Sequence, residues 1–186
     1  MPSRMTSDHL AVDAAEPALV ASAALVHGIS IEHTFETAHR LPQLPGKCTS
    51  LHGHSWRVTI SVTAPGLGDE GIVVEYGALK AGVRAWIDTH LDHGTMLGTG
   101  DPLIEPLIAA GCKVFRFGLV PTLGAGPQDL AVDLAWPTVE AVAVLLGRMS
   151  AKILAGLPCA AGSRVSRVVV REIHLNTAIY APVSAR

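Results

Sequence analysis

The chain of 186 residues is long enough for one domain with a hydrophobic core, and nearly half of its residues are apolar. The formal net charge of -2, with no long basic run, argues against nucleic acid as a partner, and the lack of about twenty consecutive uncharged apolar residues argues against a membrane span. Three widely spaced cysteines do not match a disulfide framework, which favours a reducing cytoplasm as the location.

The first 28 residues are expected to form a flexible extension ahead of the folded domain. Residues 14–26 are rich in alanine, as a signal peptide can be, but Glu16 and Pro17 interrupt them and no strongly basic start precedes them. A flexible or weakly helical extension over residues 1–28 and a single domain over residues 29–186 are therefore predicted.

Two strands, each with an apolar and a polar face, are predicted to follow. In residues 29–41 and again in residues 52–63, apolar side chains share one parity and polar side chains the other. The prolines and glycine of residues 41–47 interrupt this alternation and predict a loop between the two strands.

The rest of the chain is predicted to alternate helices with short strands. The expected elements are a strand at 72–75, helices at 76–91 and 101–110, a strand at 113–117, a helix that begins near Pro137, and a strand at 164–175. The Gly- and Pro-rich residues 118–136 predict a loop, within an insertion at 98–136. This order predicts an α+β domain whose helices lie on an antiparallel sheet.

Three histidines are in phase with the apolar side chains of the first two strands. His52 and His54 are two residues apart, so they point to one face, and His39 is in phase with the apolar residues before it. A lone histidine on such a face is more often a hydrogen-bonded core residue, but three buried imidazoles together are costly unless something pairs them. The pattern therefore favours Zn²⁺ bound by three nitrogens, with an open fourth position as in catalytic sites.

Cys48 has a setting that suits a chemical role. It lies in the predicted loop, beside Lys47 and shortly before His52, and a nearby positive charge favours the nucleophilic thiolate. A base or nucleophile next to a metal is one interpretation, and a small buried side chain is the other. Cys112 and Cys159 lack such surroundings and are predicted to have no chemical role.

Two further groups carry alternatives that the residues alone leave open. Asp92 and His93 end the first long helix, where they act either as local caps or as a pair in which the carboxylate orients a proton-moving imidazole. Glu172 is in phase with Val168 and Val170 on an apolar face. A carboxylate there needs a partner, either an arginine or a ligand with paired N–H donors.

Taken together, these residues resemble the superfamily of 6-pyruvoyltetrahydropterin synthase and 6-carboxytetrahydropterin synthase. The matching stretches follow the family's order and cover most of the chain from residue 29 onward: residues 35–41, 48–54, 71–80, 91–93, 137–140, and 170–172 with Tyr180. The spacing of three residues between Cys48 and His52 is similar to the bacterial 6-carboxytetrahydropterin synthase branch of queuosine and 7-deazapurine biosynthesis. The animal biopterin-forming branch has a longer gap there.

The resemblance implies a tunnelling fold, or T-fold. In this fold the antiparallel sheets of several subunits, each with two long helices on one face, join into a barrel. Such homo-oligomers are commonly trimers stacked into hexamers, with active sites between subunits. The resemblance also implies zinc held by His39, His52 and His54, and Cys48 as the general base.

The resemblance assigns the remaining roles to proton transfer and pterin binding. Asp92 and His93 would form a proton relay that can come from a neighbouring subunit. Glu172 would hold the 2-amino/N3 edge of a pterin or take part in the relay, and Thr138 and Glu140 would lie near the pterin end.

The resemblance implies a zinc-dependent lyase that acts on 7,8-dihydroneopterin triphosphate, with triphosphate and acetaldehyde lost in the carboxy-forming branch. The alternatives are the 6-pyruvoyl-forming reaction, which keeps the three-carbon side chain, and a metal-binding oligomer without turnover. The chain has Glu75-Tyr76 where the family has Asp-Phe, and Ala141 where the family has Asn. These differences leave Cys48 and all three expected metal ligands in place, so they bear on substrate range more than on reaction type.

Overall fold

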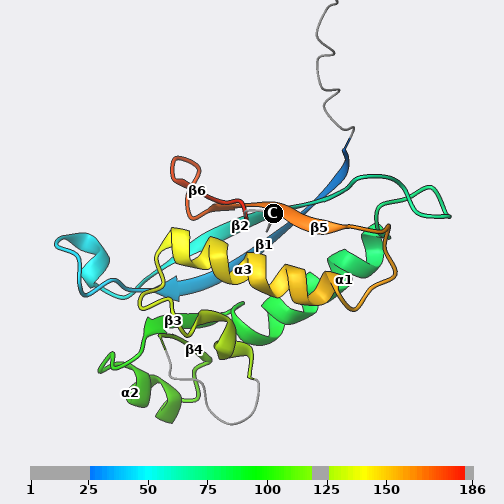
Figure 1. Cartoon of the computed structure of the whole chain (residues 1–186). Coiled ribbons are helices and arrows are strands. Elements are labelled where there is room, and N and C mark those ends of the chain that lie inside the picture. Colours follow the sequence, from blue (N-terminus) through cyan, green and yellow to red (C-terminus); the bar gives the residue numbers. More distant parts are fainter. Residues whose placement is uncertain (1–25, 119–125, 183–186) are drawn as a thin grey trace, which may run out of the picture.

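The computed structural model describes residues 26–118 and 126–182, so residues 1–25 of the predicted extension, residues 119–125 of the predicted insertion and residues 183–186 lie outside the described part. A six-stranded sheet in the order β4-β3-β1-β2-β5-β6 is the frame of the molecule (Figure 1). Its strands are β1 (His27–His39), β2 (His52–Ala64), β3 (Gly94–Gly98), β4 (Val114–Phe117), β5 (Arg164–Arg171) and β6 (Thr177–Tyr180). The helices are α1 (Tyr76–His90), α2 (Ile104–Ala109) and α3 (Val139–Leu154), with short 3-10 turns η1 (Lys47–Thr49) and η2 (Pro127–Ala131).

The two longest strands form the centre of the sheet and confirm the predicted hairpin. β1 and β2 each have 13 residues and pair antiparallel from His27 opposite Ala64 to His39 opposite His52. From Trp56 to Ala64, the β2 side chains of one parity are fully buried, whereas their polar neighbours are half-buried or exposed. This alternation gives the hairpin one face for the core and one for solvent. β1 begins two residues before the predicted start.

The two long helices lie on the same face of the sheet, as predicted, and α1 runs beside α3 (Figure 1). α1 buries Leu79, Val83 and Ile87 completely, and α3 buries a wider stripe against β5 and β6. Burial of a side chain of this size stabilises the fold by roughly 1.5–3 kcal/mol. The helices therefore hold the sheet in place through one continuous core. None of the helices in the described part is long and apolar enough to cross a bilayer.

The prediction of a strand at residues 72–75 is wrong. Val74 makes only an isolated bridge, and Glu75 begins the helix instead. The Glu75 carboxylate accepts hydrogen bonds from the backbone amides of Gly77 and Ala78, as an N-cap residue does. The same bonds hold the pKa of Glu75 below its ordinary value.

One edge of the sheet is parallel, which the sequence did not predict. β3 pairs parallel with β1 and β4 pairs parallel with β3, whereas β1, β2, β5 and β6 keep the predicted antiparallel order. The last predicted strand ends at Arg171 rather than residue 175, and the chain returns as β6. Residues 98–136 include α2, β4 and η2 beside this parallel edge.

Candidate active site

Three histidines from the paired ends of β1 and β2 meet on the face that carries the core. His39 lies opposite His52 in the ladder, and His54 lies opposite Thr37. The ring centroids are 4.8 Å apart for His39 and His52, 5.2 Å for His39 and His54, and 4.8 Å for His52 and His54. The structure thus brings together the three residues that strand parity placed on one face.

Backbone carbonyls fix the orientation of two of these rings. Nδ1 of His39 lies 2.8 Å from the carbonyl oxygen of Pro137, and Nδ1 of His52 lies 2.8 Å from that of Ser50. Because a carbonyl oxygen can only accept, each Nδ1 carries the proton and donates it. In a neutral ring Nε2 then keeps its lone pair, which is the arrangement of metal-bound histidines.

Glu172 joins the histidines from the end of β5. Its Oε1 lies 2.8 Å from Nε2 of His39 and 3.2 Å from Nε2 of His54. Both nitrogens are buried, and despite these short distances neither has a partner with hydrogen-bond geometry. The four-donor cluster consists of one atom each from His39, His52, His54 and Glu172, and these atoms all lie within 4.8 Å of one another.

The donor atoms of the four-donor cluster suit a bound cation. Burial lowers the pKa of His54 below its ordinary value, which favours the neutral ring. Contact with His39 holds the pKa of Glu172 below its ordinary value, so its carboxylate is ionised at neutral pH. A carboxylate and imidazole lone pairs at these distances repel one another unless a proton or a metal ion lies between them. Three neutral imidazoles and one carboxylate suit Zn²⁺, so the residues fit the metal.

Cys48 lies in η1, within the loop that joins β1 to β2, and its side chain is exposed. The amide of Leu41 donates to the Cys48 carbonyl at 2.7 Å, which ties the loop to the end of β1. The sulfur is not among the atoms of the four-donor cluster. The interpretation of Cys48 as a small buried side chain therefore does not hold, and the thiol faces solvent beside the strand ends that carry the histidines.

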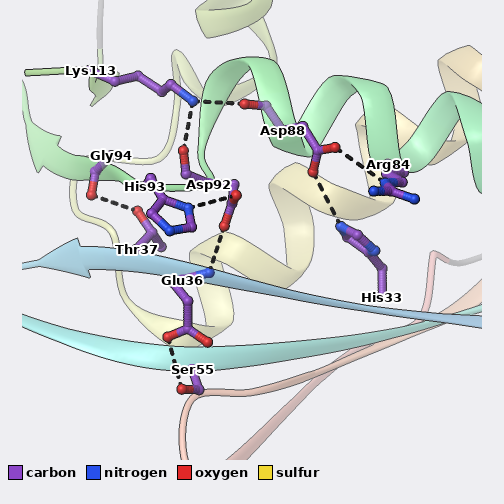
Figure 2. A network of polar contacts seen from close by, with 10 residues as sticks. All are labelled: His33, Glu36, Thr37, Ser55, Arg84, Asp88, Asp92, His93, Gly94 and Lys113. Atoms are coloured by element: carbon purple, nitrogen blue, oxygen red, sulfur yellow. Dashed lines mark hydrogen bonds and ion pairs between the residues drawn. The ribbon is translucent and has the colours of Figure 1, made fainter.

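The turn between α1 and β3 holds Asp92 and His93 against β1 (Figure 2). Oδ1 of Asp92 accepts from the Glu36 amide at 2.8 Å, and the His93 amide donates to the Glu36 carbonyl at 2.6 Å. Oδ2 of Asp92 lies 2.8 Å from Nδ1 of His93, which donates to it. The His93 side chain is 79% exposed, and only its Nδ1 contacts Asp92.

This geometry favours the orienting pair over a local helix cap. α1 ends at His90, and the Asp92 carboxylate binds the backbone of β1 rather than the helix. Burial alone would raise the pKa of Asp92, but hydrogen bonds from the Glu36 amide and the His93 ring outweigh it and the pKa lies below its ordinary value. His93 has a φ of 52°, a left-handed conformation that is uncommon for a residue other than glycine. The backbone of Glu36 holds this turn in place through its hydrogen bonds to Asp92 and His93.

His93 lines a surface hollow of about 330 Å³. His54 borders the same hollow, so the exposed imidazole and one member of the four-donor cluster share it. The carboxylate of Glu36 also lines the hollow and accepts from the Ser55 hydroxyl at 2.8 Å (Figure 2). The sequence pattern missed Glu36 because its parity in β1 is that of a solvated face, and only the pairing with β3 reveals the hollow.

The start of α3 reaches the histidines through its backbone. Thr138 caps the helix, since its Oγ1 accepts from the Ala141 amide at 3.2 Å, and Glu140 is exposed in the first turn. The neighbouring Pro137 carbonyl orients His39. Pro137 was missed as a site residue because a carbonyl contact leaves no signal in the side-chain pattern, and the pterin roles of Thr138 and Glu140 stay predictions.

Comparisons with known proteins agree with this fold. The family model described as 6-pyruvoyl tetrahydropterin synthase matches residues 28–182. The 6-carboxy-5,6,7,8-tetrahydropterin synthase of Synechocystis sp. is 38% identical over 85 residues, which cover 42% of this chain and 66% of the relative. The probable 6-carboxy-5,6,7,8-tetrahydropterin synthase of Halobacterium salinarum is 40% identical over 111 residues, which cover 59% of this chain and 60% of the relative. The chain thus spans about two thirds or less of these relatives.

A solved structure extends the likeness to nearly the whole fold. The structure of Caenorhabditis elegans 6-pyruvoyl tetrahydropterin synthase aligns with a TM-score of 0.56 at 17% sequence identity. The alignment covers 86% of this chain and 97% of that one. At this identity the likeness concerns the fold alone, and it confirms the T-fold.

Proposed function

Because the chain belongs to the 6-pyruvoyl tetrahydropterin synthase family, we propose that it is a zinc-dependent lyase acting on 7,8-dihydroneopterin triphosphate. The proposed products are 6-carboxy-5,6,7,8-tetrahydropterin, triphosphate and acetaldehyde. The observation that carries the proposal is the convergence of His39, His52 and His54 with one carboxylate on a single position. The names of the relatives and the spacing between Cys48 and His52 support the carboxy-forming branch.

The metal end of the proposed site is supplied by His39, His52 and His54. A zinc ion bound there lowers the pKa of hydroxyl groups that bind to it and polarises them. The chain keeps the rings in place, because the carbonyls of Pro137 and Ser50 hold the Nδ1 protons of two of them.

Two exposed side chains are proposed to move protons. Cys48 acts as the general base that removes a carbon-bound or hydroxyl proton of the substrate side chain. His93 returns or shuttles a proton at Nε2, because Asp92 holds the Nδ1 proton and stabilises the imidazolium. Their exposure supports these roles, since both groups can reach a molecule bound from outside.

Pterin binding is proposed for the residues around the end of β5 and the start of α3. Glu172 has a carboxylate that can accept the paired N–H groups of the 2-amino/N3 edge, and it can also take part in proton transfer. Thr138 and Glu140 follow Pro137, whose carbonyl contacts His39, so the first turn of α3 lies beside the histidines.

We also propose that the protein works as a cytoplasmic homo-oligomer built from trimers, which can stack in pairs into a hexamer. β6 is an edge strand of the sheet, and the exposed side chains of Ile179 and Leu175 lie on it and on the turn before it. An exposed apolar edge strand offers unpaired backbone groups to another chain. Pairing of such edges would build the barrel that the family resemblance implies.

Metal removal tests the proposed function. The purified protein is assayed for zinc, and triphosphate release from 7,8-dihydroneopterin triphosphate is measured before chelation, after chelation and after zinc is restored. Release is expected to follow the zinc content up to one ion per chain. If the protein binds zinc but no preparation releases triphosphate, the result would instead indicate a metal-binding oligomer without turnover. The 6-pyruvoyl-forming reaction also releases triphosphate. The two reactions are distinguished by the side chain of the pterin product, which keeps three carbons only in the 6-pyruvoyl-forming reaction.

A further inference from the structure

We infer that Glu172 occupies the fourth coordination position of the metal in the substrate-free protein, and that a hydroxyl oxygen of the substrate displaces it. The inference rests on the proposed function, because it takes the metal site and a polyhydroxylated substrate as given. It adds a second state of the same site. A closed form has three imidazoles and a carboxylate, and an open form has three imidazoles and a substrate oxygen.

The closed form follows from where the Glu172 oxygen lies. Its Oε1 is within 3.2 Å of two imidazole nitrogens, at 2.8 Å from His39 and 3.2 Å from His54, and its side chain is 13% exposed. The four donors lie within 4.8 Å of one another, which places the carboxylate among the ligands rather than behind them. A carboxylate that served only to bind a distant part of the substrate would have no reason to face two unpartnered Nε2 atoms.

A closed set of four ligands creates a conflict with catalysis. Zinc sites with four protein ligands are typically structural, whereas catalytic sites keep one position for water or substrate. The conflict is resolved if one of the four ligands exchanges. An oxygen donor is the natural one to exchange, because a substrate hydroxyl replaces it with the same type of atom.

The backbone shows which of the four ligands can move. His39 and His52 lie opposite each other in the β1–β2 ladder, and His54 is also paired there, so their positions are fixed by strand pairing. Glu172 lies one residue beyond β5, after the last ladder pair between Arg171 and Thr177. Its carboxylate can therefore swing away without breaking a strand–strand hydrogen bond.

The connection after Glu172 makes few apolar contacts. Residues 172–176 join β5 to β6, and their side chains include Leu175 at 76% exposure and Ile173 at 36%. Segments with little buried apolar surface open at low cost compared with core strands. Three ligands on paired strands and one on an exposed connection are the arrangement that an exchanging fourth ligand needs.

Cobalt substitution tests the closed form directly. Co²⁺ replaces zinc in the full-length protein, and its visible absorption reports the number and type of ligands. The parent protein is expected to show the intense bands of a four-coordinate site with no added water ligand. Glu172→Ala and the milder Glu172→Gln should both change this spectrum. Both variants should also lower zinc affinity in a chelator competition by about 10-fold or more, since even partners outside the ligand shell contribute 10- to 100-fold.

A matched control and a ligand complete the experiment. Glu32→Gln changes an exposed carboxylate on the other face of β1 and should leave the spectrum and the zinc affinity unchanged. Added 7,8-dihydroneopterin, which has the hydroxyl groups but no triphosphate, should shift the cobalt spectrum of the parent protein. An unchanged spectrum while fluorescence shows bound pterin would overturn the displacement.

The outcomes separate this inference from the proposed function. If the parent protein binds one metal ion and Glu172→Ala leaves both the cobalt spectrum and the zinc affinity unchanged, Glu172 is not a ligand and the inference fails alone. If the folded parent protein binds no stoichiometric metal, the proposed function fails with it. A spectral change and weaker zinc binding in the Glu172 variants, with normal Glu32→Gln, would support the closed form.

Discussion

The four-donor cluster and the Asp92–His93 pair are built in opposite ways. His39 is 1% exposed and its ring is held by the Pro137 carbonyl, whereas His93 is 79% exposed and only its Nδ1 is held. The cluster draws three donors from the paired ends of β1 and β2 and the fourth from the residue just after β5, all in one chain. The pair presents the His93 imidazole to solvent. The four-donor cluster is thus preformed within one chain, whereas the Asp92–His93 pair lies open to solvent.

Loss of a cluster histidine should have the largest effect. His52→Ala removes a nitrogen donor, and we expect loss of stoichiometric zinc and a fall in turnover of at least about 1000-fold, because the metal supplies several kcal/mol of charge stabilisation. Metal analysis and triphosphate release measure the two effects. His27→Ala, at the exposed start of β1, is the matched control and should keep the zinc content and turnover of the parent. Retention of one zinc by His52→Ala would contradict the ligand assignment.

Cys48→Ala should separate the two ends of the site. The sulfur lies outside the four-donor cluster, so zinc content should stay at the parent level while turnover falls by about 100- to 10,000-fold, as expected for a lost general base. Cys112→Ala changes another exposed cysteine and should keep normal turnover. Equal rates for Cys48→Ala and the parent would remove Cys48 from the mechanism.

Asp92→Asn should change which nitrogen of His93 carries the proton. The amide that replaces the carboxylate can donate to Nδ1, so the ring proton moves to Nε2 and the base is lost. We expect about a 100-fold fall in turnover, an altered pH profile of kcat/KM and a reversed tautomer in the nitrogen spectrum of the His93 ring. Zinc should be retained. Asp88→Asn is the control, and a similar rate loss there would point to a general effect of charge.

The smallest effect is expected far from both ends, at the ion pair between Asp133 and Arg148. Arg148 Nη2 donates to Asp133 Oδ2 at 2.7 Å, and this hydrogen bonding holds the pKa of Asp133 below its ordinary value. The pair therefore stabilises the fold above the unfolded pKa, and its contribution is lost as pH falls through the lower folded pKa. Because Asp133 is 58% exposed, Asp133→Asn should cost only about 0.5 kcal/mol at pH 7. In urea unfolding, the difference in stability between Asp133→Asn and the parent should shrink as pH falls through the lowered pKa of Asp133. A difference that stays constant at acidic pH would contradict this expectation.

The sequence predicted that the three histidines meet, and the reason is physical. Side-chain parity in two adjacent strands decides which residues share a face, so His39, His52 and His54 could be placed together before their distances were known. Glu172 was placed on an apolar face with an unidentified partner. Parity could not show that its partners are the histidines, because that depends on where β5 ends along β2, opposite Arg57.

The parallel edge of the sheet could not be predicted in the same way. β3 is buried along nearly its whole length, so it has no alternation of apolar and polar side chains. Residues 72–75 have the β-branched composition of a strand, but Glu75 begins a helix because it caps the amides after it. The hollow beside His93 depends on this edge, which is why Glu36 and Ser55 were not foreseen.

We propose that the four-donor cluster, Cys48 and the Asp92–His93 pair together convert 7,8-dihydroneopterin triphosphate. The most direct measurement incubates the zinc-assayed, full-length protein with this substrate and identifies the pterin side chain by mass spectrometry. We predict 6-carboxy-5,6,7,8-tetrahydropterin with acetaldehyde and triphosphate in equal amounts. A product that keeps the three-carbon side chain would contradict the proposed carboxy-forming branch. Substrate left unchanged by zinc-loaded protein would contradict the proposed lyase function itself.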